Sequence, residues 1–174
     1  QLRNELPIHG EAFKARPDAM AVIHAHPRSV LLCSMSGIDL RAVCGAYDPG
    51  LLNLALEGVP VFPKSILIRT PELAAQLLRT LGEKPVCIMR GHGITTIGRT
   101  VQEAALRAIQ GDELAALCWD LSSRGAIQEI DRDDQDEFRR MASQSAGTPA
   151  SRDAWAWRYY VRRLVDETPQ WSNT

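Results

Sequence analysis

The stretch Ala19-Met20-Ala21-Val22-Ile23-His24-Ala25-His26-Pro27 decides how the rest of the chain is organised. It begins as an apolar run and ends in two histidines that stand one residue apart. Side chains of a strand alternate between its faces, so His24 and His26 are expected to point to the same side. Pro27 cannot donate to a sheet ladder and indicates that regular pairing ends there. The pattern therefore predicts a buried strand over 19–25 that presents two imidazoles to one point in space, as a divalent metal requires.

A third histidine stands in a similar position. His92 lies between Gly91 and Gly93, after a second apolar run at 85–89. A single histidine is more often a hydrogen-bonded structural residue than a ligand. Glycines on both sides, however, permit a tight turn and a close approach, and they leave the imidazole no neighbouring side chain to pack on. Three histidines from two strand ends match the ligand set of a catalytic divalent site that keeps a position open.

A carboxylate and a further imidazole precede the first strand. Glu5 and His9 are four residues apart in a helix predicted over 5–15, so they share one face of that helix. Glu5 could add a metal ligand or act as the general base of the site. We therefore treat Glu5 and His9 as the candidate catalytic residues.

The remaining elements follow from capping and periodicity. Thr70-Pro71-Glu72 is typical of a helix start, and Thr100-Val101-Gln102-Glu103 is a capping box that opens the longest predicted helix. Helices are predicted at 5–15, 28–37, 70–81, 100–122, 131–141 and 151–167, extended segments or strands at 19–25, 41–44, 58–63, 65–69, 85–89 and 94–97, a loop with a helical turn at 47–56, and a flexible loop at 143–149. Strands alternate with helices without an internal repeat, so the predicted class is α/β.

The composition of the 174 residues is typical of a globular protein, with 45% hydrophobic residues, 24% charged residues and a net charge of −1. This balance gives no reason to expect nucleic acid or an anionic membrane as a partner. No apolar run approaches the roughly 20 residues that span a bilayer. The four cysteines are scattered and predict reduced, mostly buried thiols of a cytoplasmic protein. The chain lacks an initiator Met and opens in a polar segment, so we expect residues 1–174 to form one domain whose N-terminal part is missing.

Together these motifs resemble the class II aldolase/adducin-like family, which is typified by L-fuculose-phosphate aldolase. The resemblance covers about residues 5–121 and rests on Glu5-x-x-x-His9, Arg16-Pro17-Asp18, Ala21-Val22-Ile23-His24-x-His26 and Gly91-His92-Gly93, in that order. It implies a single-domain, three-layer α/β fold with a central, mostly antiparallel sheet flanked by helices. It also implies that His24, His26 and His92 bind the metal and that Glu5 is the acid/base residue. Members of the family form homotetramers with sites at subunit interfaces, where an aromatic residue of the neighbour can complete the chemistry.

Two further features point to one branch of that family. Arg3-Asn4 stands where the sugar-phosphate aldolases have a pair of serines that helps to bind the substrate phosphate. The forked donors of an arginine suit a carboxylate, so Arg3 and Asn4 are candidate substrate-binding residues, although Arg3 is equally compatible with a solvated surface role. The family's other phosphate-binding turns lie upstream of this chain, which leaves phosphate binding open. The segments 6–11 (LPIHGE) and 89–93 (MRGHG) are similar to the branch that decarboxylates hydroxylated aromatic or pyridine carboxylates.

The resemblance thus favours a lyase, namely a metal-dependent, non-oxidative decarboxylase of a small hydroxylated aromatic or heteroaromatic carboxylate. The metal would chelate the ring oxygen and the carboxylate, and Glu5 or His9 would protonate the ring carbon. The alternative is a class II aldolase or epimerase that acts on a sugar phosphate through an enediolate. A second alternative is a non-catalytic, adducin-like scaffold. Three imidazoles beside a carboxylate suit Zn or Mn best, and Fe or Co as well.

Overall fold

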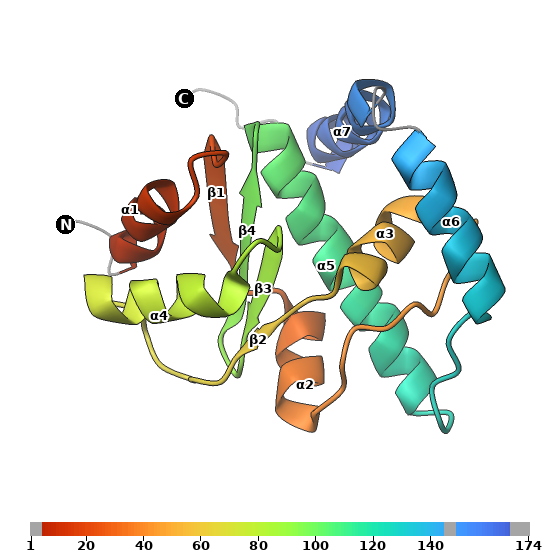
Figure 1. Cartoon of the computed structure of the whole chain (residues 1–174), viewed down its shortest axis with the longest axis horizontal. Coiled ribbons are helices and arrows are strands. Elements are labelled where there is room, and N and C mark those ends of the chain that lie inside the picture. The colour runs from red at the N-terminus through yellow and green to blue at the C-terminus, as the bar shows by residue number, and fades with distance from the viewer. Residues whose placement is uncertain (1–4, 145–148, 168–174) are drawn as a thin grey trace.

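The centre of the molecule is a four-stranded mixed sheet (Figure 1), seen in a computed structural model that describes residues 5–144 and 149–167. Its strand order is β1-β4-β3-β2. The pairs β1/β4 and β3/β4 are antiparallel, and β2/β3 is parallel. The strands are β1 (Ala21–Ala25), β2 (Val61–Phe62), β3 (Val86–Met89) and β4 (Gly93–Gly98). The predicted α/β class and the mostly antiparallel sheet are confirmed.

Helices cover both faces of this sheet. Figure 1 shows α1 and α4 on one side and α2, α3 and α5 on the other, with α6 and α7 farther out. The helices of the described chain are α1 (Leu6–Ala15), α2 (Arg28–Ser36), α3 (Pro49–Glu57), α4 (Pro71–Leu81), α5 (Val101–Ser122), α6 (Arg132–Gln144) and α7 (Pro149–Glu167). The arrangement is the three-layer one that the resemblance implied.

Strand alternation along β3 divides the apolar interior into two cores. Cys87 and Met89 pack with residues of α1 and α4, whereas Val86 and Ile88 pack with residues of α2, α3 and α5. All four side chains are buried, as expected for a short central strand with a helical layer on each face. The strand ends next to the histidines therefore lie between two packed helical layers.

The helix starts predicted from capping residues are confirmed. The Thr70 hydroxyl accepts a hydrogen bond from the Leu73 N–H at 3.3 Å, and the Thr100 hydroxyl accepts one from the Glu103 N–H at 3.1 Å. The Glu103 carboxylate reaches back to the Arg99 N–H at 2.6 Å, one residue before the N-cap. The capping box thus forms, except that the Glu103 carboxylate accepts from the N–H of Arg99 instead of from that of the N-cap residue Thr100.

Two segments that were predicted as strands are not strands. In 41–44 the Ala42 carbonyl accepts from the Ile130 N–H at 2.9 Å, so this segment pairs with a loop. In 65–69 the Ile68 N–H donates to the Glu5 carboxylate at 2.9 Å instead of to a neighbouring strand. Short apolar runs of this kind favour extended backbone, but they do not reveal whether a partner strand lies beside them.

The expectation of a loop with a helical turn at 47–56 was also wrong. The structure forms the nine-residue helix α3 there, with Asp48 as N-cap and Pro49 at its start. The Asp48 side chain accepts from the N–H groups of Gly50 and Leu51 at 2.7 and 3.2 Å. These are strong helix-start signals, and the weak apolar period of the segment hid them.

Smaller differences concern element ends. Of the extended segment at 58–63, only Val61–Phe62 joins the sheet, and β1 begins at Ala21 rather than at residue 19. The loop predicted at 143–149 falls partly on 145–148, outside the described residues, and α6 extends to Gln144. None of the described helices combines the length and the apolar character that crossing a bilayer requires.

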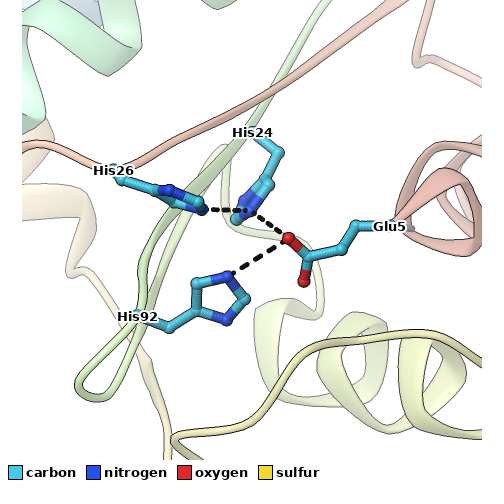
Figure 2. A group of neighbouring side chains, drawn as sticks. All are labelled: Glu5, His24, His26 and His92. Carbon is cyan, nitrogen blue, oxygen red and sulfur yellow. Dashed lines mark hydrogen bonds and ion pairs between the residues drawn. The ribbon is translucent and has the colours of Figure 1, made fainter. Parts of the chain in front are cut away.

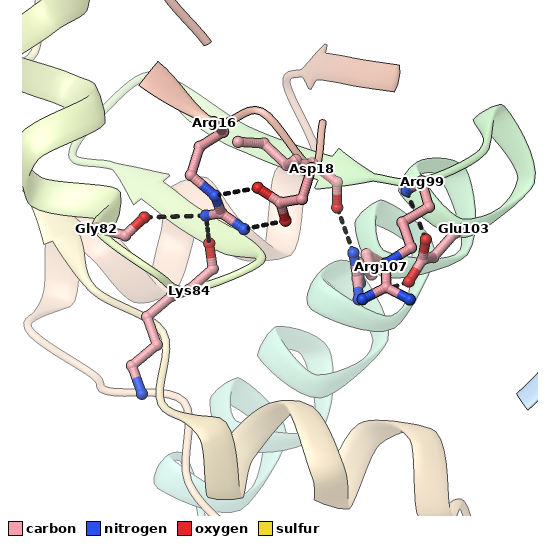
Figure 3. Close-up of polar contacts among 8 residues, drawn as sticks. Arg16, Asp18, Gly82, Lys84, Arg99, Glu103 and Arg107 are labelled. Atoms are coloured by element: carbon pink, nitrogen blue, oxygen red, sulfur yellow. Dashed lines mark hydrogen bonds and ion pairs between the residues drawn. The ribbon is translucent and has the colours of Figure 1, made fainter. Parts of the chain in front are cut away.

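Arg16 ties the end of α1 to the start of β1 and to the turn between α4 and β3 (Figure 3). Its guanidinium forms two parallel hydrogen bonds of 2.8 Å to the carboxylate of Asp18. It also donates to the carbonyl oxygens of Gly82 and Lys84 at 2.9 and 3.0 Å. We call this group, Arg16, Asp18, Gly82 and Lys84, the arginine brace. Its four hydrogen bonds join segments that lie up to 68 residues apart in the sequence.

Candidate metal centre

Four side chains from three separate segments converge where β1 ends and β4 begins (Figure 2). They are Glu5, His24, His26 and His92, and one ligand atom from each lies within 4.8 Å of the others. The three imidazole centroids are 4.8, 4.9 and 4.9 Å apart, an almost equilateral triangle. The fold thus brings together the three candidate ligands and the carboxylate that the sequence suggested.

The pairing of β1 with β4 positions the first two imidazoles. His24 stands opposite Thr95, and its Nδ1 lies 3.1 Å from the carbonyl oxygen of Ile94. A proton on Nδ1 donates to that carbonyl, which leaves Nε2 with its lone pair directed at the cluster. His24 Nε2 lies 2.9 Å from His26 Nε2. Two ring nitrogens thus converge on one point, as adjacent ligands of a single ion do.

Two glycines let the second segment reach the first. Gly91 has a φ of 64°, a left-handed conformation that favours glycine and closes the turn between β3 and β4. A Cβ atom on Gly93 would collide with the carbonyl oxygen of Ala25 and would lie 2.9 Å from Cδ2 of His26. The expectation that glycines around His92 serve a tight turn and a close approach is confirmed.

His92 has the surroundings of a metal ligand rather than of a structural histidine. Its side chain is only 8% exposed, and within the described residues neither ring nitrogen has a hydrogen-bond partner. Its Nε2 lies 3.3 Å from Oε2 of Glu5, and the same oxygen lies 3.2 Å from His24 Nε2. Leaving a buried polar atom unpaired costs about 1–3 kcal/mol. A cation that accepts one lone pair from each imidazole removes that cost for the nitrogen of His92 that binds it, so the donor set fits a divalent metal.

Glu5 is directed into the cluster by a backbone amide. Its Oε1 accepts from the Ile68 N–H, while Oε2 faces His24 and His92. Burial acts to raise the pKa of the Glu5 carboxyl, but the Ile68 N–H and the two imidazoles outweigh it and hold the pKa below its usual value. For His24 burial has the opposite effect: it lowers the pKa of the imidazole, against the attraction of Glu5. Burial thereby favours the neutral imidazole that binds metals.

The other candidate residues from the sequence have different outcomes. His9 is half-buried on α1, one turn beyond Glu5, and it is not a member of the four-residue cluster. Its catalytic role stays a prediction. Arg3 and Asn4 lie outside the described residues. Sequence reasoning missed the Ile68 N–H altogether, because a backbone donor 63 residues from its acceptor has no signature in the side chains.

The cluster opens to solvent beside His26, which is exposed. Four apolar side chains that are 44–56% exposed belong to neighbouring segments: one follows Glu5, two precede Ile68, and one lies beside Gly91. We call this set the apolar rim; it comprises Leu6, Ile66, Leu67 and Met35.

Fold and cluster together define an α/β protein with a three-histidine, one-carboxylate candidate metal centre. A family model described as "Class II Aldolase and Adducin N-terminal domain" matches residues 1–119. The chain therefore belongs to the class II aldolase and adducin family, and the resemblance seen in the sequence motifs is confirmed.

Individual relatives refine this placement. The chain is 39% identical over 161 residues to a 3,4-dihydroxyphthalate decarboxylase of Terrabacter sp. (strain DBF63), which covers 92% of this chain and 65% of that relative. An aldolase II superfamily protein from Pseudomonas syringae has a TM-score of 0.73 at 23% identity, over 90% of this chain and 61% of the other. An L-fuculose 1-phosphate aldolase from Glaciozyma antarctica PI12 has a TM-score of 0.71 at 18% identity, over 96% and 61%. The chain thus spans less than two thirds of the length of each.

Proposed function

We propose that this protein is a metal-dependent, non-oxidative decarboxylase of a hydroxylated aromatic or heteroaromatic carboxylate. The observation that carries the proposal is the convergence of three imidazoles on the Glu5 carboxylate within 4.8 Å. The choice of decarboxylation is supported by 39% identity to a 3,4-dihydroxyphthalate decarboxylase, whereas the aldolase neighbour at 18% identity supports the fold alone.

His24, His26 and His92 would hold the metal, and Zn or Mn fits this donor set best, with Fe or Co next. When bound, a divalent ion supplies Lewis-acid stabilisation for an oxyanion of the substrate. The protein fixes the direction of the ligands before any ion arrives, because the Ile94 carbonyl orients His24 and the glycine turn orients His92. The substrate would approach next to His26, the exposed member of the set.

Glu5 would move the proton that the reaction needs. Loss of CO2 from an intact aromatic ring would leave an unstabilised carbanion in the ring plane, so the ring carbon must gain a proton before the bond to the carboxylate breaks. In the free protein Glu5 is held as a carboxylate, which suits it to accept the phenolic proton and deliver it to that carbon. CO2 then leaves, which restores the aromatic ring as a phenolate, and a proton from solvent returns to the phenolic oxygen. His9, one turn away, is the second candidate donor.

The apolar rim supports a planar aromatic substrate. Side chains such as Met35 and Ile66 offer dispersion contacts to a ring face but no hydrogen bonds to the hydroxyls of a polyol. We further propose that Arg3, with Asn4, pairs with a substrate carboxylate through its forked donors. An aromatic acid and not a phosphosugar then satisfies both the apolar and the charged parts of the site.

Aldolase or epimerase chemistry on a sugar phosphate is the second candidate, because it needs the same ligands and the same acid/base residue. A non-catalytic adducin-like scaffold is third, since a scaffold does not require three ligands and an acid. The deciding experiment measures CO2 release from ortho-hydroxy aromatic and pyridine carboxylates beside retro-aldol cleavage of fuculose and ribulose phosphates, with metal-free protein as control. CO2 from an aromatic acid is expected. Cleavage of a phosphosugar without any CO2 overturns the decarboxylase and establishes the aldolase.

We also propose that the protein is a cytoplasmic homotetramer. The four cysteines are free and buried, which suits a reducing compartment. A groove of about 560 Å³ between α3, α5 and α7 is lined by exposed aromatic side chains, with Tyr47 82%, Trp155 70% and Tyr159 50% exposed. Such a surface favours burial against a neighbouring copy, which could then supply an aromatic residue to the site. Light scattering at micromolar concentration is expected to give four times the monomer mass, and a monomer contradicts it.

A further inference from the structure

Ser34 is a buried hydroxyl that links two distant parts of the chain. It lies on α2 and is 8% exposed. Its Oγ donates to the Leu31 carbonyl at 2.9 Å, which is the usual way for a helical serine to satisfy its proton. The same oxygen accepts a hydrogen bond from the Gly91 N–H at 3.2 Å, across 57 positions of sequence. The Ser34 hydroxyl therefore acts both as a hydrogen-bond donor and as an acceptor.

Gly91 is held on several sides. A Cβ atom there would lie 2.8 Å from the Ser65 hydroxyl and 2.9 Å from the sulfur of Met35, so α2 and the loop before α4 both press on this turn. The next residue is His92, whose N–H donates to the Met89 carbonyl at 3.0 Å. Two successive amides of the turn, the N–H groups of Gly91 and His92, are thus both held by hydrogen bonds.

The ring of His92 depends on that backbone more than the ring of His24 does. His24 is oriented by its own hydrogen bond to the Ile94 carbonyl. His92 has no hydrogen bond at either ring nitrogen within the described residues. Apart from the 3.3 Å contact of its Nε2 with the Glu5 carboxylate, the direction of the ring toward the cluster is set by the turn that carries it. The only side-chain hydrogen bond to the Gly91 N–H among the described residues comes from Ser34.

We propose that Ser34 is a positioning residue for the metal centre: its hydroxyl holds the Gly91 amide and thereby directs His92 at the point where His24 and His26 converge. The inference rests on the proposed metal-binding function. Helix α2 begins at Arg28, directly after His26-Pro27. The same helix therefore follows the ligands His24 and His26 in the chain and is hydrogen-bonded, through Ser34, to the turn that carries His92. Ser34 touches neither substrate nor metal and acts only through His92.

The test measures Zn²⁺ affinity by competition with a chromophoric chelator, and the visible spectrum of bound Co²⁺, which reports ligand geometry. Ser34→Ala removes the acceptor. Ser34→Thr keeps a hydroxyl that can make the same i−3 bond, and Ser34→Cys keeps the shape with a weaker acceptor. Ser36→Ala, an exposed serine of the same helix, is the matched control. The melting temperature of each metal-free variant separates loss of fold from loss of affinity.

We expect Ser34→Ala to lose about 10-fold in Zn²⁺ affinity, the lower end of what outer-shell partners of metal ligands contribute, together with a changed Co²⁺ spectrum. Ser34→Thr should stay within about 3-fold of the parent, and Ser34→Cys should fall between the two, as a net hydrogen-bond contribution of this size implies. Equal affinities for Ser34→Ala and Ser36→Ala overturn the role of Ser34 alone. A loss of melting temperature with unchanged affinity and spectrum also overturns it. If the parent protein binds no Zn²⁺, the metal centre itself is overturned.

Discussion

Two polar clusters lie at opposite ends of α1, and they differ in how their polar atoms are satisfied. The helix between them has ten residues and is about 15 Å long. In the arginine brace, the guanidinium of Arg16 meets four acceptor oxygens at 2.8–3.0 Å. In the metal centre, ring nitrogens face ring nitrogens, and both nitrogens of His92 lack a hydrogen-bond partner within the described residues.

The comparison separates a structural cluster from a binding one. Donors and acceptors match in the brace, so it gains its full free energy when the chain folds. In the metal centre three imidazoles and a carboxylate converge on one point, and the unpaired His92 gains a partner there only when a cation lies between them. Substitutions in the brace should therefore change stability and spare metal binding. Substitutions in the metal centre should do the reverse.

The largest effect is expected for His92→Ala. Removing one of three imidazole ligands should reduce the metal content of the purified protein from about one ion per chain to near zero and abolish activity with it. Elemental analysis by mass spectrometry measures the ratio. His9→Ala, a histidine outside the cluster, is the control and should keep its metal. Full occupancy in His92→Ala would remove this residue from the ligand set.

Glu5→Gln should come next. Gln keeps an oxygen for the Ile68 N–H and nearly the same shape, but it cannot carry a proton, so turnover is expected to fall by about 10²- to 10⁴-fold while substrate still binds. Rates of CO2 release and equilibrium binding of the substrate give the two quantities. Glu11→Gln, on the same helix and paired with Lys14, should leave both unchanged. A variant with weaker substrate binding but normal turnover at saturation would contradict the proton-transfer role.

Arg16→Ala tests the other end of α1. The Arg16 side chain is 14% exposed. Its loss removes the hydrogen bonds to the Asp18 carboxylate and leaves the carbonyl groups of Gly82 and Lys84 without this donor. We expect the free energy of unfolding to fall by about 2–3 kcal/mol, or the melting temperature by about 5–10 °C, while the metal content stays at the parent level. Arg16→Lys should recover only part, because an ammonium cannot form the paired bonds. Loss of metal in folded Arg16→Ala would erase the distinction between the two clusters.

The smallest expected effect is the pH dependence that Asp18 adds. Hydrogen bonds from Arg16 lower the pKa of Asp18 from 3.8 to about 2. A depressed pKa in the folded state means that this stabilisation is complete above about pH 4 and is lost as the pH falls through about 2. Asp18 is half exposed, so its contribution should not exceed about 1 kcal/mol. Urea unfolding of the parent and of Asp18→Asn between pH 2 and pH 6 should give curves that converge at the acid end. Parallel curves would contradict the assignment.

Much of the fold could be predicted because its signals are local. The apolar runs at 19–25 and 85–89, together with the Thr70 and Thr100 caps, identified two strands and two helices of the described chain. The segment 65–69 has the same apolar composition as a strand, yet its Ile68 N–H serves the Glu5 carboxylate. Pairing is a property of two segments, and a single segment does not contain it.

The sequence by itself determined the chemistry of the candidate site. Two histidines at alternate strand positions, one histidine between glycines and a glutamate before the first helix already specified the donor types. Only the tertiary structure decided their geometry: the register that sets His24 opposite Thr95, the Ile68 amide that turns Glu5 inward, and the place of His9 outside the cluster. The reason is physical. Donor type belongs to a side chain, whereas the direction of its lone pair depends on backbone contacts made by residues far away in the chain.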